Sequence, residues 1–385
     1  MHHRSTNPAA EPTRAEALRA AVSVVVLLFL FLVGIRGLGD GFKLLGGDLL
    51  DQFFSATANP FIALMVGILT TTLVQSSSVT TSMVVGLVAA PENPLPLANA
   101  VPMIMGANIG TTVTNTIVSI AHMGRPDEFR RAFGVATCHD FFNFLSVLVL
   151  LPAEIATGFL SKTASTLADR LPAFGGGPDI DSPVAMALKA VLGPVRAVSE
   201  WMFESPVAQG AVLVLVGGAL IFGSLMLIVR ALHSTLLAKA ERMVRAALGG
   251  SGVAAILIGC VVTAMVQSSS ITTSLLVPLA GVGLITLRQA FPVTIGANLG
   301  TTITALLATL AVSGPNSQAG VEIALTHLGF NVAGTLLVYP WRPVRGSVLA
   351  AVRRFSALAT EKRLLAIAYL VVLFYGLPAI LALFF

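Results

Sequence analysis

Long apolar runs separated by short polar connections dominate the chain. A helix needs roughly 20 apolar residues to cross a bilayer. Runs of about this length predict plain membrane-spanning helices near residues 17–38, 133–151, 207–231, 321–340 and 364–385. In two other regions, 55–122 and 250–311, Gly, Pro, Asn, Ser and Thr interrupt the apolar stretches, so we expect broken helices there.

Composition excludes a water-soluble fold. The chain is 55% hydrophobic and 11% charged, with a mean hydropathy of +0.88, whereas soluble domains carry about 25% charged residues. The net charge of +5 does not indicate nucleic-acid binding, because Lys and Arg cluster between the apolar runs, as in cytoplasmic loops. The run at 17–38 is too long for a signal-peptide core, so we interpret it as a retained anchor. The prediction is an all-α polytopic membrane protein without nucleic-acid partners.

The two interrupted regions are copies of each other. The segment GILTTTLVQSSSVTTS, which starts at Gly67, matches GCVVTAMVQSSSITTS, which starts at Gly259. The segment PMIMGANIGTTVTNT from Pro102 matches PVTIGANLGTTITAL from Pro292. In a third block the same three residue types recur in the same order, as His139, Phe142 and Asn143 and as His327, Phe330 and Asn331. Three collinear blocks indicate an internal duplication, which is typical of transporters.

Charge in the connections predicts that the copies are inverted. The approach to the first copy, GDGFKLLGGDLLDQ, is acidic, whereas 239–245 before the second is basic. Residues 125–131 hold three arginines, while their counterpart, 313–320, is uncharged. Acidic residues outnumber basic ones in 152–206, and the reverse holds in 341–363. Because basic connections prefer the cytoplasm, we expect the N-terminus inside the cell and the C-terminus outside.

This organisation divides the chain into five parts. They are 1–54, a cytoplasmic N-terminus, first transmembrane helix and external segment; 55–151, the first repeat; 152–249, an external loop, linking transmembrane helix and cytoplasmic linker; 250–340, the second repeat; and 341–385, a basic cytoplasmic loop and last transmembrane helix.

The Gln-Ser-Ser-Ser segments are the strongest candidates for a site. They begin at Gln75 and Gln267, each about halfway along an apolar hairpin and therefore near the bilayer midplane. A single Ser/Thr run in a membrane helix is usually bonded back to the preceding turn. Recurrence of the whole segment in both copies favours a site instead. A helix break there exposes N–H groups and a positive helix end for an anion, and oxygen atoms for sodium.

The Gly-Ala-Asn segments give a second set of candidates. Their glycines fit a helix-packing pattern equally well. Asn108 and Asn298 favour a polar role, because hydroxyls follow each of them on one helix face. These hydroxyls belong to Thr111, Thr112 and Thr114 in the first copy and to Thr301, Thr302 and Thr304 in the second.

The histidines of the third block are less informative. His139 and His327 lie near the starts of predicted spans, where a structural histidine is common. Asp140 is matched by Leu328 in the second copy, so any role for it breaks the symmetry. The Gln-Ser-Ser-Ser and Gly-Ala-Asn segments contain no Lys or Arg, so an anion there must be held by dipoles, hydroxyls and co-bound cations.

Together these segments resemble the type II sodium-dependent inorganic phosphate cotransporters. The resemblance covers about residues 20–380 and is most specific from Pro102 to Glu154. It implies sodium-driven phosphate uptake, with sodium as a co-transported ion, no organic cofactor, and a bacterial inner membrane as the location. The resemblance implies substrate binding by both hairpins, Gln75, Ser76, Ser77, Ser78, Gln267, Ser268, Ser269 and Ser270, to which the motif analysis adds Asn108 and Asn298. It implies sodium binding by Gln267, Ser268, Ser270, Thr301 and Thr304, and the duplication adds Gln75, Thr111 and Thr114 as further candidates.

The sequence departs from the animal members of this family in two ways. Those members have longer tails and a further C-terminal span, so their tail-based regulation does not carry over. Their external loop is disulfide-bonded, whereas residues 152–206 contain no Cys.

Three other functions remain open at this point. A sodium-coupled carboxylate or other oxyanion carrier would also use paired polar hairpins, and competition by sulfate or arsenate would distinguish the substrates. A channel could share the same lining. An intramembrane serine hydrolase would pair a hairpin serine with His139 or His327, but a duplicated nucleophile would be redundant, so we expect no enzymatic activity.

Overall fold

The structure is a computed structural model that describes residues 14–45, 47–90, 93–170, 183–247, 249–312 and 315–384. These residues form helices and no strands. Six helices are long and apolar enough to cross a membrane: Val22–Leu44, Pro126–Thr157, Pro206–Ile228, Leu287–Ala311, Ser317–Val338 and Arg363–Ala382. Five of them match the predicted plain spans, which confirms an all-α multi-pass membrane protein.

Parts of several predicted segments lie outside the described residues. They are 1–13 of the expected cytoplasmic N-terminus, 46 of the acidic approach, 91–92 of the first repeat, 171–182 and 248 of the connection between the copies, 313–314 of the uncharged connection, and 385 at the end of the last span.

The first half of the chain contains eight helices that the sequence predicted only in outline. They are α1 (Arg14–Leu44), α2 (Gly47–Thr57), α3 (Pro60–Val74), α4 (Ser77–Val88), α5 (Leu97–Gly110), α6 (Val113–Ile120), α7 (Pro126–Thr157) and α8 (Phe159–Ala168). The 152–206 connection also contains α9 (Pro183–Met202). The connection that we expected to be a loop is therefore partly helical.

The second half repeats this order after a linking helix. It contains α10 (Pro206–Ala247), α11 (Gly252–Val266), α12 (Ser269–Ser274), α13 (Leu276–Gly281), α14 (Leu287–Ala308), the short 3-10 turn η1 (Thr309–Ala311) and α15 (Ser317–Val338). The basic segment after it forms α16 (Arg342–Glu361), and the last span is α17 (Arg363–Val371), the π-turn η2 (Val372–Gly376) and α18 (Leu377–Phe384).

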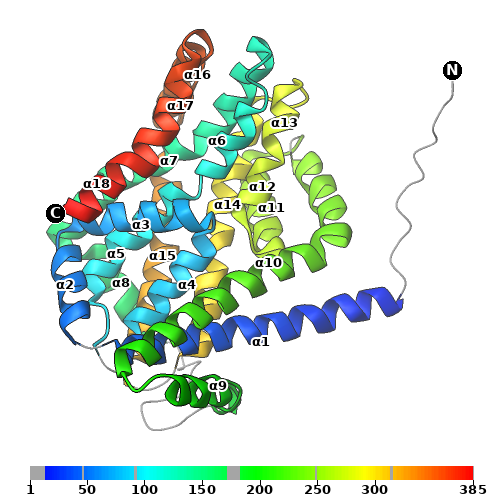
Figure 1. Ribbon diagram of the computed structural model, residues 1–385. Helices are drawn as coiled ribbons and strands as arrows, with labels where there is room; N and C mark the ends of the chain where they lie inside the picture. Colours follow the sequence, from blue (N-terminus) through cyan, green and yellow to red (C-terminus); the bar gives the residue numbers. More distant parts are fainter. Residues whose placement is uncertain are drawn as a thin grey trace.

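Figure 1 shows α1 and α10 side by side along the lower edge of the bundle. Above them, α3, α4 and α5 lie on the left of the view and α11 and α12 on the right. Many large apolar side chains face outward, among them Leu73, Leu148, Leu215 and Leu364, each at least 65% exposed. An apolar exterior of this kind is what contact with lipid requires.

One expectation about the second copy is wrong. We predicted a broken helix at both Gly-Ala-Asn segments, and in the first copy a turn at Thr111 and Thr112 does separate α5 from α6. In the second copy α14 runs unbroken from Leu287 to Ala308. The threonine hydroxyls bond back to the preceding turn in both copies, from Thr301 and Thr302 in α14 as from Thr111 and Thr112 in the first copy, so these bonds do not decide whether the helix breaks.

Glycines bring the Gly-Ala-Asn helices against the hairpins. A Cβ atom on Gly106 of α5 would lie 2.0 Å from Leu64 O of α3, and one on Gly296 of α14 would lie 2.0 Å from Ile256 O of α11. No side chain fits in that space. The glycines therefore set the helix contact, and they place the residues after Asn108 and Asn298 beside the Gln-Ser-Ser-Ser turns.

The equivalent helices α7 and α15 run in opposite directions. Glu322, in the second turn of α15, lines the same pocket as Glu154 near the C-terminal end of α7. Ser165, on α8 directly after α7, is 3.2 Å from Glu322. A helix of 32 residues is about 48 Å long and spans the bilayer, so the start of α15 lies on the side where α7 ends.

Candidate functional site

The first Gln-Ser-Ser-Ser segment forms a tight turn between two helices. Gln75 ends α3 in the left-handed conformation (φ 59°, ψ 23°), and its N–H donates to Thr71 O. Ser76 is extended (φ −151°), and its Oγ accepts the N–H of Val79 at the start of α4. Such a serine is a strong helix N-cap. The turn therefore presents the N-terminus of α4 to its surroundings.

The second segment adopts the same turn. Gln267 ends α11 at φ 56° and ψ 25°, with its N–H bonded to Thr263 O. Ser268 is extended at φ −151°, and it caps α12 through the N–H of Ile271. Identical local sequence thus gives identical local geometry in both copies.

Each glutamine is held by a threonine from the Gly-Ala-Asn segment of its own copy. Thr114 Oγ1 donates to Gln75 Oε1 at 2.9 Å, and Thr304 Oγ1 donates to Gln267 Oε1 at 2.8 Å. In each copy, the glutamine and one threonine of the predicted sodium-ligand set are therefore in contact.

The two turns also meet each other. Ser78 Oγ of the first turn lies 3.4 Å from Gln267 O and 3.4 Å from Thr304 Oγ1. Four oxygen atoms from Ser78, Gln267 and Thr304 are thus gathered at the second turn. Neutral oxygen ligands of this kind suit a hard cation such as sodium. The contribution of Ser78 to this cluster was not expected, because it crosses between the copies.

Three serine hydroxyls at the turns have no protein partner. Within the described residues, the side chains of Ser77, Ser269 and Ser270 make no hydrogen bond, although they are only 4%, 3% and 9% exposed. Their oxygen atoms keep some accessible surface, unlike those of Thr71 and Thr72, which are fully buried and also lack a partner in the described structure. The three serines are placed beside the N-termini of α4 and α12, where a ligand could reach their hydroxyls.

Other predicted ligands are already engaged by the backbone. Thr111 Oγ1 donates to Ala107 O, as Thr301 does to Ala297 O. Ser76 and Ser268 serve as helix caps. Their oxygens retain lone pairs, so their assignment as sodium or substrate ligands stays a prediction.

Asn108 and Asn298 belong to a buried polar network that joins the two copies. Asn298 Nδ2 donates to Asn143 Oδ1 at 2.8 Å and to Asn331 Oδ1 at 2.9 Å, and its Oδ1 lies 3.0 Å from His139 Nε2. Each histidine reaches the asparagine of the other copy, because His327 Nε2 lies 3.4 Å from Asn108 Oδ1.

The amides of this network are therefore occupied by protein partners. Contact of Asn108 or Asn298 with substrate stays a prediction. Sequence reasoning gave no role to Asn143 and Asn331. Their spacing of four residues after His139 and His327 places each pair on one helix face, which was a usable signal.

Two contacts are present in only one copy. Asp140 Oδ2 accepts a 2.8 Å hydrogen bond from the hydroxyl of Tyr369 on α17. Asn115 of α6 exchanges hydrogen bonds with Thr273 and accepts one from Ser274, both after the second turn. The counterpart of Asn115 is Ala305, so sequence symmetry could not reveal this bridge.

The arrangement does not resemble a hydrolytic site. Nε2 of His139 and of His327 faces an asparagine, and in the part of the chain that the structure describes neither histidine is bonded to a hydroxyl at the turns. Among the same residues no three His, Cys, Asp or Glu side chains are grouped as metal ligands. A cation at the turns would be held by neutral oxygens.

Comparison with known proteins identifies relatives along nearly the whole chain. Sodium-dependent phosphate transport protein 2B of Homo sapiens is 32% identical over 91% of this chain and 63% of its own length. Protein 2A of Rattus norvegicus is 34% identical over 92% of this chain and 66% of its own length. The chain thus spans less than two thirds of these relatives.

No solved structure matches the chain. The family model described as Na+/Pi-cotransporter matches residues 30–164 and 219–379. These matches include both turns, both Gly-Ala-Asn segments and the histidines of the network. The chain therefore belongs to the Na+/Pi-cotransporter family.

Proposed function

We propose that this chain is a secondary transporter that couples sodium influx to the uptake of inorganic phosphate. The observation that carries the proposal is the set of nearly buried hydroxyls without protein partners, Ser77, Ser269 and Ser270, at two helix N-termini. Hydroxyl donors and positive helix ends suit a small oxyanion. The names of the curated relatives favour phosphate among such anions.

Phosphate binds between the two turns in this proposal, with hydroxyls from both copies. Sodium binds at the second turn, where Ser78 Oγ lies 3.4 Å from Gln267 O and from Thr304 Oγ1, and Thr304 Oγ1 lies 2.8 Å from Gln267 Oε1. Ser268, Ser270 and Thr301 complete the ligand set. No basic side chain belongs to these segments, so the cation supplies charge that phosphate needs. This is a physical route to coupling.

Transport proceeds by alternating access between two inverted repeats. The antiparallel course of α7 and α15, which carry equivalent His and Asn residues, supports the inversion. We place the chain in a bacterial inner membrane with a cytoplasmic N-terminus, because this orientation puts the arginines of 341–363 inside.

Uptake by proteoliposomes tests the proposal. Labelled phosphate should accumulate under an inward sodium gradient and not under an equal potassium gradient. Arsenate should compete more strongly than sulfate or a dicarboxylate. Equal uptake under both cations would reject sodium coupling, and preferential inhibition by a dicarboxylate would reassign the substrate.

A further inference from the structure

A second candidate anion site lies away from the turns. A pocket of about 420 Å³ is lined by the starts of α11, α14 and α16 and the end of α15, and it is open to the surface. Four arginines line it, Arg288, Arg342, Arg345 and Arg353, and its lining contains no acidic side chain. We call it the arginine pocket.

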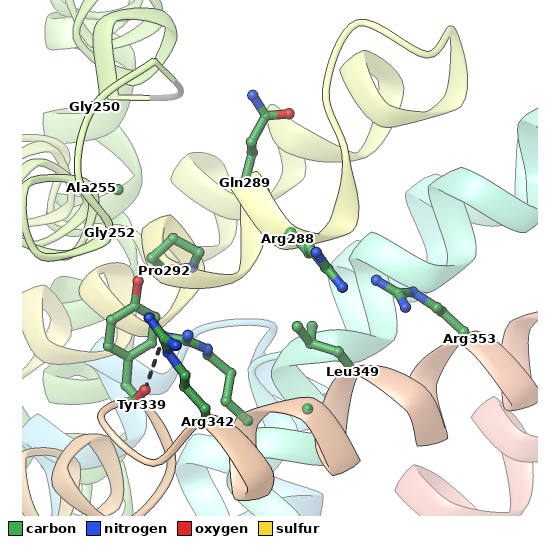
Figure 2. Close-up of a pocket in the computed structure, with 12 residues that line it drawn as sticks. Gly250, Gly252, Ala255, Arg288, Gln289, Pro292, Tyr339, Arg342, Leu349 and Arg353 are labelled. Carbon is green, nitrogen blue, oxygen red and sulfur yellow. Dashed lines mark hydrogen bonds between the residues drawn. The ribbon is translucent and has the colours of Figure 1, made fainter.

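The arginines are poorly compensated by the protein. Figure 2 shows the guanidinium groups of Arg288 and Arg353 pointing toward each other across the pocket. The guanidinium groups of these two residues and of Arg342 make no hydrogen bond or ion pair with another described residue. All three residues are exposed, so water and salt screen part of their mutual repulsion, and an anion between them would compensate the rest. Arg345 differs, since it donates to Tyr339 O at 3.1 Å and its guanidinium lies 4.8 Å from the centre of the Tyr339 ring.

Helix ends add to the positive potential. Residues in the first turns of α11, α14 and α16 line the pocket, namely Gly252, Arg288 and Arg342. Three helix N-termini, two of them capped by Ser251 and Thr286, therefore converge on one cavity that already holds guanidinium groups, and each brings a positive dipole end. Guanidinium forks are suited to bidentate contact with phosphate oxygens.

An adjoining pocket of about 500 Å³ extends the basic surface. It shares Arg288 and Arg353 with the arginine pocket and adds Arg130 and Arg131, with Asp127 as its one acidic lining residue. Arg131 is engaged, because it donates to Gly281 O at 2.7 Å. One carboxylate thus faces several arginines.

The fold alone does not require these charges. A pocket of about 690 Å³ at the other end of α7 is lined by equivalent positions of the first copy. Pro60 corresponds to Gly252, Pro102 to Pro292, and Gly158 to Gly346, by the same alignment of the copies that pairs the turns. In that pocket Ala98, Glu154, Thr157 and Ser165 stand at the positions of Arg288, Arg342, Arg345 and Arg353.

We propose that the arginine pocket binds the phosphate group of an anionic ligand. Two sources share this chemistry, the head group of an anionic phospholipid and inorganic phosphate. The pocket lies outside both turns, and the proposal does not depend on sodium coupling. A merely topological role for the arginines would require positive charge on this side of the membrane but no specific binding.

Binding measured on the purified full chain tests the proposal. The pocket variant carries Arg288→Gln and Arg353→Gln. The matched control carries Arg354→Gln and Arg363→Gln, which remove the same charge from exposed positions that line neither arginine-bearing pocket. One arm measures equilibrium binding of labelled inorganic phosphate without sodium. The other counts phosphatidylglycerol retained by the protein in nanodiscs of mixed phosphatidylglycerol and phosphatidylcholine.

In one arm or the other the pocket variant should bind about tenfold more weakly than the parent, since hydrogen bonds to charged groups are the strong ones. The control should match the parent. A loss confined to phosphatidylglycerol identifies a lipid site, and a loss confined to labelled phosphate identifies a free-anion site. Equal binding by parent, control and pocket variant in both arms overturns the proposal. If the pocket variant melts early, Arg288→Lys with Arg353→Lys keeps the charge, and it should still lose affinity because Lys lacks the fork.

Discussion

The two Gln-Ser-Ser-Ser turns have the same backbone but different surroundings. Gln75 is exposed, and its side-chain oxygen contacts Thr114 alone. Gln267 is half-buried, its partner Thr304 is 1% exposed, and Ser78 reaches both of them from the other copy. Local sequence therefore determines the backbone of each turn. The number of oxygen atoms around the glutamine depends on the other copy, which contributes Ser78 at the second turn. A ligand held by both turns should depend on them equally, whereas a ligand held at the second turn should not.

The same contrast extends to the ends of the two copies. Equivalent positions line a pocket with four arginines in the second copy and one with Glu154 and no arginine in the first. Duplication preserved the cavities, and substitution gave them different charge. Four properties test whether the two copies differ in this way: their topology, the stability of the buried network, phosphate binding and sodium binding.

Topology gives the all-or-none test. In a background without Cys138 and Cys260, Gly124→Cys and Ser317→Cys place single thiols before α7 and at the start of α15. Because these helices run in opposite directions, a membrane-impermeant maleimide should label the two positions from opposite sides. Labelling of both from one side would reject the inverted arrangement and, with it, the equivalence of the two turns.

The buried network predicts the next largest effect. Asn298→Leu removes contacts within 3.0 Å to His139, Asn143 and Asn331 and leaves three buried polar groups unpaired. Each such group costs about 1–3 kcal/mol, so the apparent melting temperature in detergent should fall sharply. Asn108→Leu should cost less, since its contacts to His327 and Asn331 are both 3.4 Å long.

Phosphate binding separates this structural role from a substrate role. Because Asn298 is also a predicted substrate ligand, purified Asn298→Leu that retains its fold at low temperature should bind phosphate more weakly than the parent. Parental phosphate affinity in this folded variant would confine Asn298 to the structural network.

Much of this fold could be predicted from local sequence. Apolar runs predicted five of the six spans, and the duplicated motifs placed both turns. The unbroken course of α14 could not be predicted, because Gly300 and the threonines after it permit a turn or a helix, and the equivalent Gly110 packs against its hairpin in the same way although α5 ends there. Contacts between the copies, such as Ser78 with Gln267 or His139 with Asn298, depend on the tertiary arrangement. Pattern alone does not supply that information.

Substrate binding should depend on the two turns equally. Ser77→Ala and Ser269→Ala each remove a hydroxyl that has no protein partner in the described structure. Stability should therefore change little. A hydrogen bond to a charged group contributes about 1.5–3 kcal/mol, so each substitution should raise the KM for phosphate about tenfold or more in proteoliposome uptake.

Serines that cap the helices provide the contrast. Ser76→Ala and Ser268→Ala remove N-caps, which contribute about 1 kcal/mol, and should lower the melting temperature as well as transport. If Ser77→Ala and Ser269→Ala both transport like the parent, the anion lies elsewhere. If one alone matters, a single turn holds it.

Sodium binding should depend on the two turns unequally, and matched threonines provide the comparison. Thr304→Val removes the hydroxyl bonded to Gln267 Oε1 and contacted by Ser78, while Thr114→Val removes the corresponding bond to Gln75. Losing one neutral ligand of several weakens a cation site without destroying it. The half-saturating sodium concentration of uptake should therefore rise several-fold in Thr304→Val and change little in Thr114→Val. Phosphate affinity at limiting sodium should fall with it in Thr304→Val, because coupling between two bound ligands is reciprocal.

Equal shifts in the two variants would mean that the first turn also holds sodium, through Gln75, Thr111 and Thr114. A parental sodium dependence in Thr304→Val would remove Thr304 from the sodium site, because this substitution deletes the oxygen and keeps the shape of the side chain.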